Sequence, residues 1–325
     1  MTLFSATIFL MLKSEIFKTP LPYLALLLAH LLWGANYVIA KVTLHEIPVM
    51  SLSFLRFGLA CLLISPFLIN LEPKMKKVSY THLPRLIVAS LLLGTVNITF
   101  FYLGITKTLA INASVLNLIV PILSVMGAWW FLKEKIYSIN LVGIVLSLLG
   151  TAAVIGLPLL LTSNFSGVEM FGNILLILGG VSFVAGALLI KPMFKEYSPL
   201  SITAFTFLTA TIAFFIPAVF EYISNPNWIG QVSLIGIFGV LYIAILSTVV
   251  AYFLMMWSYS RIELSHAVII QYVEPAVAAS LAIPILGERI SYSFIVGFCM
   301  IALGVYWGTL GKQEHHHINH RHQKS

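Results

Sequence analysis

Long apolar stretches separated by short polar breaks run along most of the chain. Each stretch holds about 20 residues, the length that an α-helix needs to cross the hydrocarbon core of a bilayer. The apolar positions are continuous and do not alternate with polar ones, so the pattern predicts helices and not the strands of a membrane barrel. The ten predicted spans are residues 22–40, 49–70, 86–106, 112–131, 139–161, 172–190, 199–220, 232–256, 265–286 and 292–310.

The composition excludes a water-soluble fold. Apolar residues make up 60% of the 325 residues and charged residues only 9%, whereas an ordinary soluble domain has about 25% charged residues. The net charge of +7 lies in small groups between the apolar stretches, so nucleic acid is not expected as a partner. Cys61 and Cys299 each lie inside an apolar stretch, and no disulfide framework is indicated.

The basic residues predict the orientation of the spans. With a cytoplasmic N-terminus, the cytoplasmic segments would hold 14 of the 18 Lys and Arg residues. The opposite side keeps Lys41, Lys107 and Arg289, and Arg56 lies inside a span. Because cytoplasmic segments carry an excess of Lys and Arg, both termini are expected in the cytoplasm.

The second half of the chain repeats features of the first. A shift of 154 residues aligns 113–150 with 267–304 and gives 10 identities in 38 ungapped positions. Asn117 then meets Gln271, a chemical match that shared hydrophobicity does not explain. Each half holds five spans, and an odd number places the second half upside down, as in many secondary transporters. The expected regions are an N-terminal segment (1–21), a first repeat (22–161), an extracytoplasmic linker (162–171), a second repeat (172–310) and a His-rich tail (311–325).

Several short motifs follow one another along the two halves. They are Trp33-Gly34-Ala35-Asn36 with Lys41, Pro48 with Leu55-Arg56-Phe57, Tyr102 to Ala113 with Pro121 and Glu134, Ala251-Tyr252, Ala267, Glu274-Pro275 and Leu286-Gly287-Glu288. With them the chain resembles the drug/metabolite transporter superfamily, in particular its ten-span EamA-type exporters, over residues 22–310. The resemblance implies two inverted five-helix repeats around a central cavity in a bacterial cytoplasmic membrane, as a monomer or homodimer. It also implies movement of metabolites, amino acids or drugs without ATP, and the sequence has no GxxxxGK[ST] phosphate loop.

Two spans contain a proline four residues after a side-chain amide. These pairs are Asn117 with Pro121 and Gln271 with Pro275. Because proline has no N–H to give the carbonyl four residues earlier, the backbone carbonyls of Asn117 and Gln271 are predicted to lack their helical partner. Such groups need protein, water or substrate in the membrane. The sites are therefore candidates for a substrate cavity; the alternative is that the prolines only bend the helices.

Glu274 is the one acid placed well within a predicted span. A carboxylate at that depth is costly unless it is protonated or paired, and acids inside a membrane often mark ion or proton pathways. Arg56, the comparably deep basic residue, is its candidate partner. Two interpretations remain open, a structural ion pair and a coupling site that separates during transport.

One face of the first span is polar and aromatic. His30, Trp33, Gly34, Tyr37 and Lys41 follow the spacing of a single helical face, which is expected to point into the bundle. It is a candidate to line the cavity, although helix packing gives the same pattern. Further candidates for the cavity are Asn97 with Phe101, and Ser247 with Tyr252.

The tail contains His315, His316, His317, His320 and His322. Clustered imidazoles bind metals, but neither a Cys nor an Asp accompanies them, so we expect a solvated tail without a metal site and no cofactor.

Three functions compete. The first is export of amino-acid-like or drug-like metabolites across the bilayer, with protons as a candidate coupling ion. The second is import or exchange of a charged metabolite such as a nucleotide conjugate. The third is a membrane-embedded enzyme, which the composition disfavours, since such an enzyme needs converging polar side chains and the chain contains no aspartate.

Overall fold

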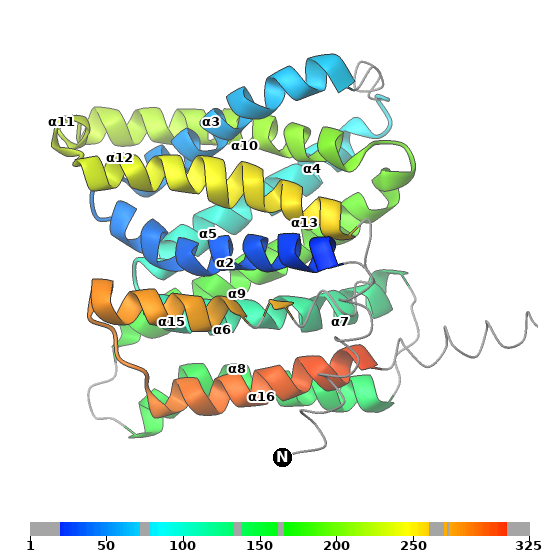
Figure 1. Cartoon of the computed structure of the whole chain (residues 1–325), viewed down its shortest axis with the longest axis vertical. Coiled ribbons are helices and arrows are strands. Elements are labelled where there is room, and N and C mark those ends of the chain that lie inside the picture. The colour runs from blue at the N-terminus through cyan, green and yellow to red at the C-terminus, as the bar shows by residue number, and fades with distance from the viewer. Residues whose placement is uncertain are drawn as a thin grey trace, which may run out of the picture.

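The computed structural model describes residues 20–71, 79–132, 138–161, 166–259, 270–271 and 273–310. Within these ranges the chain forms helices and turns, without a strand, so the predicted all-helical class is confirmed there. Figure 1 shows the long helices lying side by side with roughly parallel axes. The His-rich tail, Lys76, Glu134 and Asn164 lie outside the described residues.

The helices begin and end close to the predicted positions. In the first half they are α2 (Pro20–Thr43), α3 (Val49–Leu71), α4 (Leu83–Ser90), α5 (Asn97–Ile105), α6 (Ala110–Leu116), α7 (Val120–Leu132) and α8 (Ser138–Leu161). In the second half they are α9 (Gly167–Ile190), α10 (Pro199–Ser224), α11 (Trp228–Gln231), α12 (Leu234–Leu241), α13 (Ala251–Tyr259), α15 (Val273–Leu286) and α16 (Tyr292–Leu310).

By length and composition, these are the helices of a multi-pass membrane protein. Among the residues described, six helical stretches are long and apolar enough to cross a bilayer. These six are Leu21–Thr43, Val49–Pro66, Leu83–Ile105, Gly167–Lys195, Pro199–Ser224 and Leu234–Met255. Shorter apolar helices occupy the other four predicted positions, namely Ala110–Leu123, Leu141–Val154, Val273–Leu286 and Tyr292–Trp307.

One face of α10 illustrates how the bundle meets its surroundings. Ile212, Ile216 and Phe220 recur at helical spacing and are each more than half exposed. Phe207 and Phe214 on the opposite face are buried against the side chains of α3, where their rings contact Phe57. Exposed apolar surface of this extent is unfavourable in water and is expected of a lipid-facing helix.

α2 lies near the centre of the bundle. It packs against α15 on one side and against α13 on the other, while α3 packs against α10, α8 against α16, and α9 against both α5 and α7. Figure 1 shows α3 with α10, and α8 with α16, at opposite ends of the stack of helices. α2 therefore meets helices of the second half on two sides.

Two predicted spans contain π-helical segments. One is η2 (Leu91–Val96) between α4 and α5, and the other is η5 (Tyr242–Val250) between α12 and α13. Such segments are rare and often lie at functional sites. Asn97, a predicted site residue, directly follows η2, and Ser247, another, lies within η5.

Acids from distant segments hold helix N-termini. Both Glu221 oxygens accept backbone N–H groups in the first turn of α3, from Met50 at 3.0 Å and from Ser51 at 2.8 Å. Glu46 accepts the N–H and the hydroxyl of Ser233, both at 2.7 Å, at the start of α12. The first turn of a helix leaves N–H groups without an internal partner and attracts negative charge, so these acids tie separate helices together.

Candidate functional site

The predicted polar face of α2 packs against α15. His30 Nδ1 lies 2.7 Å from Glu274 Oε1, and the Tyr37 hydroxyl donates to Glu274 Oε2 at 3.1 Å. His30, Tyr37 and Glu274 are all at least 94% buried. Gly34, between the two α2 residues, permits the approach, because an added Cβ would lie 2.7 Å from Val277 Cβ. His30 and Tyr37 of the predicted face therefore meet at a buried acid, a partner that the sequence did not predict.

Asn117 belongs to the same network. Its side chain lies close enough to the Tyr37 hydroxyl, which donates to Glu274, to interact with it. The helix is broken here, as expected from Pro121, because the short 3₁₀ segment η3 (Asn117–Ile119) separates α6 from α7. The network thus joins α2, the broken fourth span and α15.

The prediction of unpaired carbonyls at the two proline sites is wrong. The Asn117 carbonyl accepts the N–H of Val120, and the Gln271 carbonyl accepts the N–H of Glu274 at 3.0 Å. In both cases the donor lies three residues after the acceptor, so a tighter turn replaces the bond that proline removes. Pro275 lies in the first turn of α15, where the missing N–H costs little.

Aromatic rings extend from His30 toward α10. Trp33 stacks edge-on with His30 at 5.4 Å and with Tyr252 at 5.6 Å between ring centroids. Tyr252 in turn contacts Phe207 at 6.1 Å. The Trp33 indole N–H donates to the Ser247 carbonyl at 2.9 Å, which fixes α2 to the π-helical segment η5. Three predicted cavity residues therefore meet around Trp33.

Arg56 is not the partner of Glu274. Its Nη1 donates to the Tyr102 hydroxyl at 3.2 Å, and its guanidinium carbon lies 5.5 Å from the centre of the Phe57 ring. The two ion pairs among the described residues join His30 to Glu274 and Lys41 to Glu288. Arg56 and Glu274, candidate partners from the sequence, therefore have different partners in the structure.

Asn97 does not join either group. Its side-chain amide donates to the Gly179 carbonyl at 2.9 Å and ties α5 to α9. The Gln271 side chain is partly buried, and its described bond is made by its backbone. For these two residues a cavity role stays a prediction.

Several buried polar atoms of this region have no hydrogen-bond partner among the described residues. They are His30 Nε2, Asn36 Oδ1, Arg56 Nε, Thr95 Oγ1 and Ser247 Oγ. Buried polar groups are nearly always bonded, and an exception identifies an atom whose partner is a water, an ion or a ligand. Three of these residues were candidates from the sequence, namely His30, Arg56 and Ser247.

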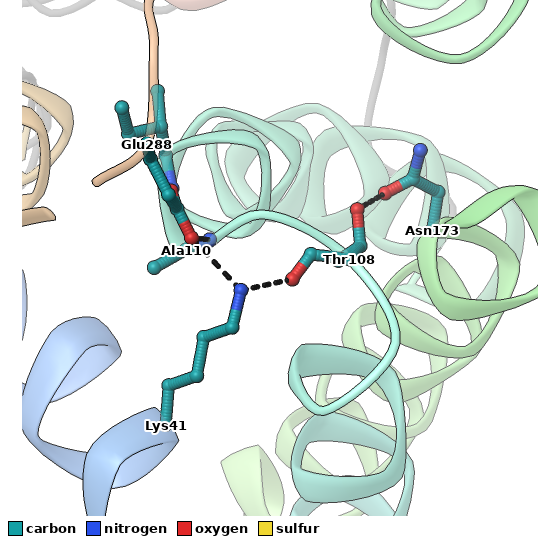
Figure 2. Close-up of polar contacts among 6 residues, drawn as sticks. Lys41, Thr108, Ala110, Asn173 and Glu288 are labelled. Carbon is teal, nitrogen blue, oxygen red and sulfur yellow. Dashed lines mark hydrogen bonds and ion pairs between the residues drawn. The ribbon is translucent and has the colours of Figure 1, made fainter. Parts of the chain in front are cut away.

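A second polar group joins α2 to the end of α15. Lys41 Nζ donates to Glu288 Oε1 at 2.8 Å and to the Thr108 carbonyl at 2.7 Å (Figure 2). The Thr108 hydroxyl donates to Asn173 Oδ1 at 2.6 Å, so α9 is included. Figure 2 shows Lys41 and Glu288 pointing toward each other beside the start of α6 at Ala110. We call Lys41, Thr108, Asn173 and Glu288 the helix-end network.

Glu288 also caps α6. Its two oxygens accept the N–H groups of Ala110 at 2.8 Å and Ile111 at 3.0 Å. The N-cap residue, Leu109, has no side-chain oxygen to do so, and an acid from the other half of the chain supplies the cap. The sequence placed Glu288 at the end of a span beside Arg289. Its actual partner, Lys41, is 247 residues away, and local spacing gives no signal for it.

No group of three metal-ligating side chains occurs within the described part of the chain. The histidines of the tail lie outside that part.

Comparison with known proteins gives a family match over both halves. The profile of the EamA-like transporter family matches residues 20–156 and again 170–309. An uncharacterized transporter of Archaeoglobus fulgidus is 27% identical over 88% of this chain and 96% of its own length. The uncharacterized transporter YoaV of Bacillus subtilis is 24% identical over 86% and 93%. A WAT1-related protein of Arabidopsis thaliana is 27% identical over 79% and 72%.

The fold also occurs among solved structures. One crystal structure superimposes with a TM-score of 0.60 over 89% of this chain and 96% of the other, at 15% identity. At that identity the likeness concerns the fold alone.

Proposed function

Because the chain belongs to the EamA-like transporter family, we propose that it is a secondary transporter that exports small amino-acid-like or drug-like metabolites in exchange for protons. The family and the names of the relatives indicate a transporter and not an enzyme. The chain is an integral, multi-pass membrane protein, and its solute, direction and coupling ion are the parts that we propose.

The proposed architecture is ten spans in two inverted repeats, residues 22–161 and 172–310. The packing supports it. The first spans of the two halves are α2 and α9. α2 packs against the fourth span of the second half (α15), and α9 packs against the fourth span of the first half (α7). In the same way α2 packs against the third span of the second half (α13), and α9 against the third span of the first half (α5). The π-helical segments η2 and η5 occupy corresponding third spans. The two halves thus share helix contacts, π-helical segments and sequence identities, and many secondary transporters are built from two such repeats.

The observation that carries the function is the Glu274–His30 pair. Its acid comes from the segment 170–309 that matches the family, and its histidine comes from the segment 20–156. Glu274 and His30 are both titratable, and Tyr37 is the third titratable group in direct contact. Movement of one half against the other would separate the pair, and a carboxylate left alone in a bilayer takes up a proton. The pair therefore links the position of the halves to proton binding.

The orientation and location follow from charge and resemblance. The distribution of Lys and Arg favours cytoplasmic termini. The resemblance to EamA-type exporters favours the cytoplasmic membrane of a bacterium and outward movement of the solute.

Comparison of metabolites tests the transport function even while the solute is unidentified. Cells that express the wild-type chain, the Glu274→Gln variant or neither are grown alike, and small molecules in cells and medium are measured. We expect one or a few organic metabolites to be enriched in the medium of wild-type cells only. Indistinguishable profiles of expressing and non-expressing cells would contradict an exporter.

Sealed vesicles then test proton coupling with the solute so identified. Glu274→Gln retains size and hydrogen-bonding capacity but stays neutral, so it is expected to exchange solute for solute without accumulating it under a pH difference. The Glu196→Gln variant, at an exposed acid, is the matched control. Undiminished pH-driven accumulation by Glu274→Gln would end the role of this residue in coupling.

A further inference from the structure

Arg56 is a buried cation whose charge no described acid balances. It is 95% buried, and neither ion pair among the described residues includes it. Its one described hydrogen-bond acceptor is the uncharged Tyr102 hydroxyl, and its Nε has no partner there. Removing a charge from water without an opposite charge costs several kcal/mol, so such a residue is stable only where something else compensates it.

The basic residue in the last turn of α2 is in a different situation. Lys41 has a carboxylate at 2.8 Å and a carbonyl at 2.7 Å. Phe57 and Tyr102 beside Arg56 supply a cation–π contact and a neutral hydroxyl, which compensate a charge only in part. The contrast indicates that the partner of Arg56 comes from outside the described chain.

Arg56 and Glu274 are connected through aromatic side chains. The rings of Tyr102 and Phe101 lie 5.6 Å apart between centroids, and those of Phe101 and Tyr37 lie 5.7 Å apart. The Tyr37 hydroxyl donates to Glu274. At 1.5 Å per residue, Arg56 lies about 10 Å into the membrane from the start of α3. A cation, an acid and aromatic rings between them suit a solute with an apolar body and one charged group at the Arg56 end.

We propose that Arg56 recognises a carboxylate group of the transported solute, so that the substrate class is organic monocarboxylates, zwitterionic amino acids included. This inference rests on the proposed transport function. A guanidinium presents paired N–H donors that match the two oxygens of a carboxylate. One cation balances one negative charge. Because Lys41 is engaged by Glu288, a doubly charged phosphate at Arg56 would lack a second cation.

Binding to purified full-length protein in detergent tests the inference apart from transport. The probes are phenylacetate, its neutral isostere phenylacetamide and the dianion phenyl phosphate, each followed by the shift in thermal unfolding temperature. Phenylacetate is expected to stabilise wild-type protein at lower concentration than either other probe. Arg56→Gln should weaken phenylacetate binding about tenfold or more, as expected for loss of a charged hydrogen bond, and leave phenylacetamide unchanged.

Two further variants keep the result interpretable. Arg56→Lys retains the charge without the paired donors and should lie between wild type and Arg56→Gln. Arg289→Gln, at an exposed arginine of the α15–α16 connection, should bind phenylacetate like wild type. If Arg56→Gln does not fold, the wild-type and Arg56→Lys proteins still show whether carboxylate is preferred and whether that preference depends on the paired N–H donors of the guanidinium.

The outcomes separate the two proposals. Wild-type protein without preference for phenylacetate over phenylacetamide, or a preference that Arg56→Lys and Arg56→Gln both leave intact, overturns the carboxylate site. If phenyl phosphate binds more strongly than phenylacetate, the site prefers dianions to monocarboxylates, and the proposed carboxylate site is overturned as well. A preference lost in Arg56→Gln, together with no transport by wild-type vesicles, supports the site and contradicts the transport function instead.

Discussion

α2 makes two contacts with acids, one with Glu274 of α15 and one with Glu288 just after the end of α15, and their surroundings differ. At the helix end, Glu288 accepts from Lys41 and from two backbone N–H groups. Deeper in the bundle, Glu274 contacts His30 and Tyr37, while His30 Nε2 and nearby Ser247 Oγ have no partner among the described residues. A fully bonded network stabilises one arrangement, whereas a partly bonded one is costly and persists where function requires it.

The comparison shows that depth alone does not identify a functional acid in a membrane protein. Glu288 is 94% buried and Glu274 is 98% buried, so burial separates them poorly. What separates them is the completeness of hydrogen bonding in their surroundings. We therefore assign Glu288 to stability and Glu274 to transport, and the following variants test that division.

Glu288→Ala is expected to have the largest effect on stability. The variant leaves Lys41 and the N–H groups of Ala110 and Ile111 without their acceptor, and breaking a buried ion pair costs about 3–5 kcal/mol. Denaturant unfolding of detergent-solubilised protein measures the loss, with Glu196→Ala at an exposed acid as the control. If both variants unfold at the same denaturant concentration, the helix-end network is not structural.

Gly34→Ala is expected to cost less and to act on both contacts at once. The new methyl group would lie 2.7 Å from Val277 Cβ and 3.0 Å from the Glu274 carbonyl oxygen, so α2 and α15 must move apart. Overpacking of this kind costs about 1–3 kcal/mol. Gly230→Ala, where an added Cβ meets nothing within 4 Å, is the matched control. Equal unfolding midpoints for both variants would show that the two helices separate freely.

The helical face that contains Gly34 shows how far the sequence predicted this region. Helical spacing placed His30, Trp33, Gly34, Tyr37 and Lys41 on one face. The structure brings His30, Gly34 and Tyr37 against α15, whereas Trp33 contacts η5 and α13. Periodicity predicts which residues share a face because the helix itself fixes their directions. Apolar length is likewise a local property, and six of the ten predicted spans coincide with described helical stretches long and apolar enough to cross a bilayer.

The partners across the bundle were not predictable in this way. Arg56 was the candidate partner of Glu274 because both are deep and opposite in charge, but the structure pairs Glu274 with His30. Glu221 and Glu46 were not identified at all, since their partners at α3 and α12 are remote in sequence. Choices among distant partners depend on how helices pack, and one sequence contains no direct signal for that. The i, i+3 bonds at Asn117 and Gln271 were missed because a proline in a pattern does not show how the backbone adjusts.

His30→Gln is expected to change stability little and transport greatly. A glutamine amide can replace the Nδ1 contact with Glu274, and His30 Nε2 has no described partner to lose, so the cost is about 1 kcal/mol or less. Proton-driven accumulation in vesicles is expected to fall at least as far as in Glu274→Gln, because the variant removes the titratable partner. A large loss of stability with normal transport would move His30 into the same class as Lys41.

Single cysteine substitutions at exposed positions perturb the structure least, and they show on which side of the membrane the helix-end network lies. Asn225 is exposed at the end of α10, close in sequence to Glu221, whose carboxylate caps the start of α3. Tyr80 is 91% exposed in the connection before α4, which Figure 1 places at the other end of the bundle. Neither side chain has a hydrogen-bond partner among the described residues, so cysteine at each position should leave folding unchanged.

In a background with Cys61→Ala and Cys299→Ala, an impermeant thiol reagent added to intact cells is expected to label Asn225→Cys and not Tyr80→Cys. The charge distribution predicts this result, because the segments beside Tyr80 carry Lys74, Lys76, Lys77 and Arg85. Labelling of Asn225→Cys would place Lys41 and Glu288 at the outer surface, so that the bonded network closes the outer end while Arg56 and Glu274 lie deeper. The reverse pattern would invert the whole chain in the membrane, and the export direction would then have to be proposed anew from the same contacts.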